Sequence, residues 1–366
     1  MAAGLLTVLL GGLLTSHSQA DGPGGGLRGS APPEGACEIS PAPPVGTAIP
    51  FDGVCSYLSG RNPAVVTQAA IFDNVSGQTY SLSTGGATQY TASIAKVDIL
   101  AKWLNGYQAE GVAIPDGIDY SIQYLMQNMI ENSNNQAATA LFYFGGGCDA
   151  LTAFNRKIPM TGTVVGCETD DYYGWGNTET TATDQVSLMK AFAYGANQYV
   201  EPGARKEAIR NCRQKIKRNA KKRRACISRV KREFDRLART PILNQAARAY
   251  GLSLMENLEP DQSWGLTCGP WGVVCDPPNY APPDPQVTVA HKNGWKTLPD
   301  CGPPIDPCPW QVNSTGWVSG GGRDYVLSIL TTNIPAGAQL TDGFNYGIDT
   351  VQGISRIIWS NLDPAT

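Results

Sequence analysis

The spacing of hydrophobic and polar residues changes several times along the chain, and each change predicts a different element. Residues 64–84, AVVTQAAIFDNVSGQTYSLST, hold two β-prone runs around an Asn-Val-Ser-Gly turn, which predicts a β-hairpin. After Ile94, the apolar residues Val97, Ala101 and Leu104 follow at offsets of three, seven and ten positions. This spacing predicts a helix with one buried face.

Helical spacing dominates the middle of the chain, and strands return after residue 264. Helices are predicted at 118–133, 134–146, 180–195 and 242–258. Strands are predicted at 286–295, 310–319 and 324–332, and a closing helix at 344–362. This order predicts an α+β protein, in which an antiparallel sheet assembled from both chain ends packs against an inserted, all-helical subdomain.

The beginning of the chain differs in composition from the rest. Residues 1–20 form a short apolar run without a charge that ends in Ser-Gln-Ala, which resembles the cleavage site of a secretory signal. Residues 21–47 are rich in Gly and Pro and predict a flexible linker, so the folded domain is expected at 48–366. No later stretch approaches the ~18–20 apolar residues of a membrane span. These features predict a secreted or envelope-associated protein without a membrane span.

The chain contains ten cysteines that fall in sequence-local pairs. Such a number is rare in the reducing cytosol and supports export. Sequence alone leaves the connectivity open, but pairing of nearest neighbours leaves no cysteine unpaired. The pairs would be Cys37–Cys55, Cys148–Cys167, Cys212–Cys226, Cys268–Cys275 and Cys301–Cys308.

Histidine is scarce: the chain has only His17, within the expected signal, and His291. A histidine-based zinc site is thereby excluded, and no metal or other cofactor is expected. A Ser-His-Asp triad would have to use His291, although such a strand histidine is more often a packed residue than a base.

The net charge of −3 conceals a strongly basic segment at 201–240. This segment contains 16 of the 28 Lys and Arg residues and 4 of the 31 acidic residues, so it carries +12 and the remainder carries 12 minus 27, or −15. A disulfide between Cys212 and Cys226 requires a turn near Asn219, because one straight helix would separate them by about 21 Å. We expect a basic helical hairpin insertion that contacts an anionic polymer.

A serine followed three positions later by a lysine occurs at Ser93–Lys96, Ser187–Lys190 and Ser228–Lys231. Ser187 lies inside a predicted helix, and Ser228 lies in the basic segment. Ser93 begins a predicted helix, where unpaired backbone N–H groups and the helix dipole can stabilise an oxyanion. Position therefore favours Ser93 and Lys96 as the reactive pair.

Two further motifs follow this pair. Ser133-Asn134-Asn135 lies at the junction of two predicted helices, and Lys292-Asn293-Gly294 ends a predicted strand. Together S-x-x-K, S-x-N and K-x-G resemble the three-motif signature of the serine β-lactamase and penicillin-binding protein superfamily, over about residues 48–362. The resemblance is closest to class A β-lactamases and their actinobacterial serine hydrolase relatives, and it implies the β-lactamase/transpeptidase-like fold.

The resemblance also implies catalytic roles. Ser93 would be the acylated nucleophile and Lys96 its general base, which requires burial and a second cation such as Lys292 to lower the lysine pKa. Ser133 would relay the proton to the leaving nitrogen. The N–H groups of Ser93 and Trp295 would form the oxyanion hole.

The remaining motif residues would bind substrate. Asn135 would hold the substrate amide, and Lys292 and Asn293 would hold its carboxylate. Gly294 would let the strand backbone approach closely.

The sequence departs from the class A pattern in the loop that carries the deacylating acid. Glu168 lies 35 residues after Ser133, near the expected spacing, but Asp171-Tyr172 follows it in place of Leu-Asn.

Three functions remain open. The first is a monomeric, secreted β-lactamase-like hydrolase acting on small-molecule β-lactams.

The second is a D-alanyl-D-alanine carboxypeptidase or esterase of the same superfamily, acting on peptidoglycan stem peptides, that binds penicillin and releases it slowly. The third is a non-catalytic envelope protein that binds polyanions through the basic segment. The three intact motifs argue against this last function.

Overall fold

The computed structural model describes residues 37–43, 47–167, 173–271, 286–298, 308–337 and 342–362. The expected signal at 1–20, most of the expected linker and Glu168 lie outside the described residues. The folded part starts before residue 48, because β1 (Glu38–Ser40) pairs with β3 in the sheet.

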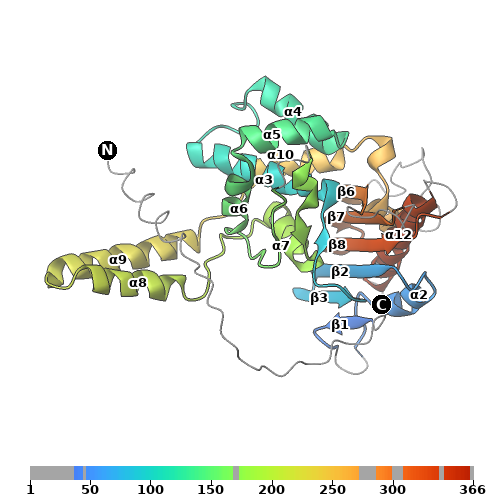
Figure 1. Ribbon diagram of the computed structural model, residues 1–366, viewed down its shortest axis with the longest axis horizontal. Coiled ribbons are helices and arrows are strands. Elements are labelled where there is room, and N and C mark those ends of the chain that lie inside the picture. The colour runs from blue at the N-terminus through green and yellow to red at the C-terminus, as the bar shows by residue number, and fades with distance from the viewer. Residues whose placement is uncertain are drawn as a thin grey trace. The chain divides into compact units, whose positions relative to one another are not determined.

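An antiparallel sheet assembled from both ends of the chain confirms the predicted fold class (Figure 1). Its strands, in spatial order, are β1, β3 (Gln78–Ser83), β2 (Val66–Asp73), β8 (Arg323–Ile334), β7 (Trp310–Gly320) and β6 (Thr288–Thr297). The predicted hairpin is β2–β3, whose turn is closed by the Gly77 amide donating to the Asp73 carbonyl at 2.8 Å. A short pair, β4 (Gln89–Tyr90) and β5 (Glu179–Thr180), lies apart from this sheet.

Each face of the sheet is covered by a hydrophobic layer. On one face, Val351, Ile354 and Ile358 of α12 (Asp342–Asn361) are buried against the strands together with α2 (Val54–Ser59). Gly347 allows this helix to lie close to β7, because a Cβ there would come within 2.4 Å of the Val312 side chain. Figure 1 shows α12 on one side of the strands and the helical subdomain on the other.

The helical subdomain packs on the opposite face through α7 and α10. Its helices are α3 (Ala95–Glu110), α4 (Tyr120–Glu131), α5 (Asn135–Phe144), α6 (Gly147–Asn155), α7 (Ala182–Ala193) and α10 (Gln245–Glu256). Side-chain caps begin four of them, with Asp119, Asn134, Thr181 and Asn244 each accepting a backbone N–H of the first turn. The position of each cap fixes where these helices start.

Disulfides join three of the predicted cysteine pairs. They are Cys37–Cys55, Cys148–Cys167 and Cys212–Cys226. Cys268 and Cys308 are also disulfide-bonded, and the other members of their predicted pairs lie outside the described residues.

The basic segment contains α8 (Ala204–Lys215) and α9 (Ala220–Leu237), which pack side by side (Figure 1). Asn219 lies at the turn and caps α9 by accepting the Lys222 amide at 2.9 Å. At the base, the Gln198 amide donates to the Thr240 carbonyl at 2.9 Å, so the chain enters and leaves the segment at adjacent points.

Candidate active site

Ser93 lies in the 3₁₀ turn η1 (Ala92–Ile94), which leads directly into α3. Ala92 has a φ of 48°, in the left-handed region that L-residues other than Gly, Asn and Asp rarely adopt. This backbone outlier directly precedes Ser93. Ser93 itself is partly exposed, whereas Thr91, Ala92 and Ile94 around it are buried.

The Lys96 side chain is fully buried, and its Nζ touches four oxygen atoms. These are Ser133 O at 2.6 Å, Asn135 Oδ1 at 2.6 Å, Ser93 Oγ at 2.9 Å and Ser133 Oγ at 3.1 Å. The first two can only accept, and the last two are hydroxyls that can also donate. A neutral amine has two N–H groups and one lone pair, so it can satisfy both acceptors and still receive a hydroxyl proton.

The surroundings of Lys96 favour that neutral form. Burial lowers the pKa of Lys96 well below its usual value, and the nearby charge of Lys292 lowers it further. Burial also lowers the pKa of Lys292, from 10.5 to about 7, and Asp261 opposes part of this shift. Lys96 is therefore suited to act as a general base near neutral pH.

The S-x-N motif reaches Lys96 because of the turn between α4 and α5. Ser133 has a φ of 53°, again in the left-handed region, and Asn134 then caps α5 by accepting the Ala137 amide at 2.8 Å. This arrangement leaves Asn135 in the first turn, where its side chain points to Lys96. The structure thus brings Ser93, Lys96, Ser133 and Asn135 together.

Strand β6 supplies the K-x-G motif at the edge of the sheet. Lys292 is fully buried and donates to the Asn293 carbonyl at 3.0 Å. Gly294 lies against Ser93, because a Cβ at this position would come within 2.8 Å of the backbone nitrogens of Ser93 and Ile94. Any larger residue would push β6 away from Ser93.

The side chains of Asn293 and Trp295 lie on the other face of the sheet, since neighbouring strand residues alternate. Asn293 is buried and donates to the carbonyls of Gln262 at 2.7 Å and Trp264 at 2.9 Å. The Trp295 ring packs 5.8 Å from that of Trp264 and 5.4 Å from that of Phe344. The structure therefore does not bring the Asn293 amide to the Lys292 side, and the Trp295 N–H as an oxyanion donor stays a prediction.

His291 is a packed strand residue. Its Nε2 lies 3.0 Å from the Trp264 carbonyl and 3.2 Å from Thr267 Oγ1. Burial and the Lys292 charge lower its pKa to about 3, so the ring is neutral at physiological pH. These contacts leave His291 no part in a triad with Ser93.

Two residues near the site were not found from the sequence. Trp175, in η2 (Gly174–Asn177), places its ring 5.0 Å from Lys96 Nζ and donates to Thr139 Oγ1 at 3.0 Å. Lys296 donates to Asn177 Oδ1, on the same face of β6 as Lys292 and Gly294. Strand alternation could have predicted Lys296, whereas no periodic signal marked Trp175.

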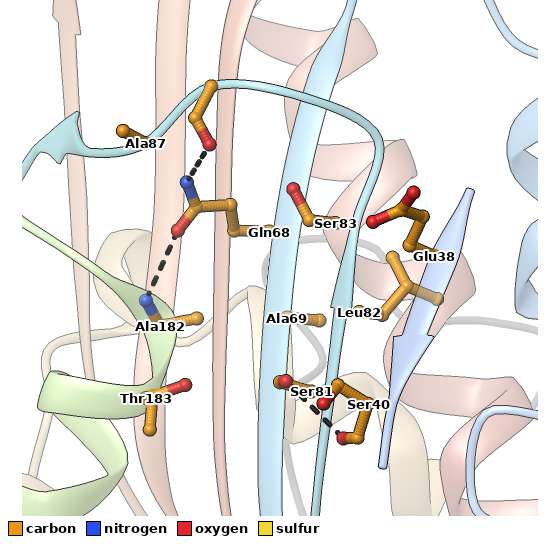
Figure 2. A pocket seen from close by; sticks show the side chains of 11 residues that line it. Glu38, Ser40, Gln68, Ala69, Ser81, Leu82, Ser83, Ala87, Ala182 and Thr183 are labelled. Carbon is orange, nitrogen blue, oxygen red and sulfur yellow. Dashed lines mark hydrogen bonds between the residues drawn. The ribbon is translucent and has the colours of Figure 1, made fainter. Parts of the chain in front are cut away.

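A cavity of about 220 Å³ lies elsewhere, between the β1–β3–β2 edge and the start of α7 (Figure 2). Gln68 spans it, donating to the Gly86 carbonyl at 3.1 Å and accepting the Ala182 amide at 3.5 Å. Strands β8 and β7 separate β2 from β6, so this cavity is distinct from the Ser93 site.

Within the described parts of the chain, no group of three His, Cys, Asp or Glu residues could hold a metal ion. None of the described helices is long and apolar enough to cross a membrane.

Comparison with known proteins identifies the family. Residues 109–362 match the β-lactamase enzyme family. The chain belongs to this family. The matched range begins after Ser93 and Lys96, so their place in the site rests on the geometry above. No curated protein matches the chain.

Solved structures of the superfamily share the fold of this family member. They include a PBP-A mutant in its acyl-enzyme complex with penicillin G, at 17% identity, 85% coverage of this chain, 95% of that chain and a TM-score of 0.54. A class A β-lactamase from Bacteroides cellulosilyticus shows 14% identity, coverages of 86% and 97%, and a TM-score of 0.53. One from Mycobacterium abscessus shows 14% identity, coverages of 85% and 98%, and a TM-score of 0.52.

Proposed function

We propose that the protein is a class A-like β-lactamase that opens small-molecule β-lactams through an acyl-enzyme on Ser93. The observation that carries this proposal is the position of Lys96 Nζ, within hydrogen-bond distance of both the Ser93 and Ser133 hydroxyls. Among the similar structures, a PBP-A mutant forms an acyl-enzyme with penicillin G. The disulfides support secretion of this enzyme, since such bonds persist in oxidising compartments.

The geometry supports a two-step reaction. Neutral Lys96 takes the proton of Ser93 while Oγ attacks the lactam carbonyl, and the Ser93 N–H stabilises the oxyanion. The carbonyl–nitrogen bond then breaks, and the nitrogen receives a proton through the Ser133 hydroxyl. Lys292 holds the substrate carboxylate, which favours the charged form of this lysine.

Water then hydrolyses the ester, releasing the opened product acid and free Ser93. Glu168 is the proposed base for this water because of its spacing from Ser133. Trp175, seven residues further on in the sequence, lies beside Lys96.

Intact-mass spectrometry after exposure to penicillin G tests the acylation step. In samples quenched with acid during turnover, we expect one penicilloyl adduct on the parent protein, none on Ser93→Ala, and an undiminished adduct on the control Ser187→Ala. Ser187 is a suitable control because it begins another S-x-x-K match and donates to the Thr183 carbonyl at 3.1 Å, within α7. An adduct that persists on Ser93→Ala would reject the assignment.

A D-alanyl-D-alanine carboxypeptidase or esterase that deacylates slowly is the second candidate. It is favoured by Asp171-Tyr172, which follow Glu168 where class A enzymes have Leu-Asn. Steady turnover of a chromogenic cephalosporin by the parent supports the β-lactamase, and a persistent adduct without turnover supports the slow enzyme. If Glu168 activates water, Glu168→Gln should acylate normally and accumulate the adduct.

A further inference from the structure

The basic hairpin (residues 201–240) carries a large positive charge that the rest of the hairpin does not neutralise. Its 16 Lys and Arg residues face 4 acidic residues. Three of those acids form ion pairs, namely Asp235 with Arg205 at 3.0 Å, Glu207 with Arg210 at 3.9 Å and Glu233 with Arg236 at 2.6 Å. Most of the basic side chains therefore have no acidic partner within the hairpin.

The hairpin holds these charges on a stiff support. The apolar residues Ile227, Val230 and Leu237 of α9 are half-buried and recur with helical spacing. Cys212 and Cys226 join the two helices. A ligand therefore meets basic groups whose backbone is already ordered, which reduces the entropy lost on binding.

The composition of the exposed surface narrows the class of ligand. Ten of the 16 basic residues are arginine, whose planar guanidinium groups bind phosphate oxygens in pairs. The exposed large hydrophobic side chains among the described residues all lie outside 201–240. The one aromatic residue of the hairpin, Phe234, is half-buried like the apolar residues beside it, so the hairpin offers little apolar surface to a bilayer and little aromatic surface to stacked bases.

We infer that the basic hairpin binds a linear phosphodiester polymer of the cell envelope and thereby holds the enzyme at the wall. The envelope source rests on the proposed secretion, because an exported protein meets the anionic polymers of the envelope rather than intracellular nucleic acid. Phosphate contacts release counterions, so the affinity falls as salt rises.

The test measures retention of the full protein on immobilised poly(glycerol phosphate) between 50 and 200 mM NaCl. The variant replaces six exposed α9 residues that take no part in the three ion pairs by glutamine: Lys221, Lys222, Arg224, Arg229, Lys231 and Arg232. The matched control exchanges Lys and Arg at the same six positions and so retains the charge.

If each of the six substituted residues contacts one phosphate, each contributes ~0.7 to the slope of log affinity against log salt. The slope of the glutamine variant should therefore be about 4 less steep than that of the parent. The charge-retaining control should keep its slope. A second variant joins Gln198 to Thr240 through Asn-Gly, because these residues are already hydrogen-bonded across the base. It should lose retention entirely and still be acylated by penicillin G.

Unchanged retention of the glutamine variant would overturn the inference. So would retention on duplex DNA with none on poly(glycerol phosphate) at equal phosphate and salt, which would assign the hairpin to nucleic acid. Equal retention on polyglutamate would also overturn the inference, because the hairpin would then recognise negative charge alone, without phosphate. Failure of the parent to be acylated would reject the proposed function and leave the retention result standing.

Discussion

Replacing Lys292 by methionine should stabilise the fold while impairing catalysis. Lys292 has no exposed surface, and burial lowers its pKa from 10.5 to about 7. Between these two pH values the unfolded chain binds a proton that the folded chain does not, so stability rises with pH. The slope from this group is about 1.4 kcal/mol per pH unit, and below pH 7 the full cost of about 5 kcal/mol remains.

Methionine keeps most of the aliphatic length of the side chain and removes its charge. The variant loses the hydrogen bond from Nζ to the Asn293 carbonyl, which contributes about 1 kcal/mol. We therefore expect a net gain in the free energy of unfolding of about 4 kcal/mol at pH 6.5, falling to about 1 kcal/mol at pH 9. Acylation by penicillin G should slow, because the substrate carboxylate loses its cation.

Urea unfolding followed by circular dichroism at pH 6.5, 7.5 and 9 measures this difference. Lys222→Met is the matched control, since Lys222 is exposed on α9 and its charge stays in water. The reasoning is refuted if Lys292→Met unfolds at lower urea than the parent at pH 6.5. It is also refuted if the two proteins have the same dependence of stability on pH.

Three further substitutions test the site and the core. Lys96→Ala should slow acylation by about 10²- to 10⁴-fold in stopped-flow assays, while Lys190→Ala should not. Gly294→Ala should destabilise the protein by about 1–3 kcal/mol and slow acylation, because its Cβ would meet backbone atoms at 2.8 Å; an unchanged rate and melting temperature would contradict this. Asp98 is buried, which raises its pKa from 3.8 to about 7, and its carboxyl group accepts a hydrogen bond from Asn155. Between these pH values the folded chain holds a proton that the unfolded chain has lost, so this group makes stability fall as pH rises. Asp98→Asn should remove that fall and gain about 2–4 kcal/mol at pH 8 in urea unfolding, and an equal pH slope in both proteins would count against it.

The sequence predicted most long elements because each buries one regular face. The hairpin at 64–84, the helix after Ser93 and the three C-terminal strands all appear where periodicity placed them. The elements that the sequence did not predict are short. β1 has three residues, and α6 has nine and begins at Gly147, directly after a glycine pair. Elements this small are held by their neighbours, so their own residues carry little signal.

The order and position of the three motifs were enough to predict which serine and lysine residues meet in the site. Position at a helix start separated Ser93 from the other S-x-x-K matches, and the structure brings this residue to Lys96 and Ser133. Asn293 was assigned to the substrate carboxylate although alternation along β6 turns it away from Lys292. The contact of Trp175 with Lys96 is made from the short 3₁₀ turn η2, which hydrophobic spacing does not encode.

The pairing of β2 with β8 has a consequence for the order in which the protein folds. Partners in this ladder, from Asp73–Tyr325 to Val66–Thr332, are 252 to 266 residues apart in the chain. The entropic free-energy cost of closing such a loop is about 3 kcal/mol higher than that of closing a loop of ten residues. This pairing is therefore expected late in folding. Until the C-terminal strands are synthesised, β2 has an open edge, and Ser93 and Lys96 have no Lys292 beside them. The contacts around Lys96 are therefore complete only after nearly the whole chain has been synthesised, so a nascent chain carries Ser93 and Lys96 long before their surroundings exist.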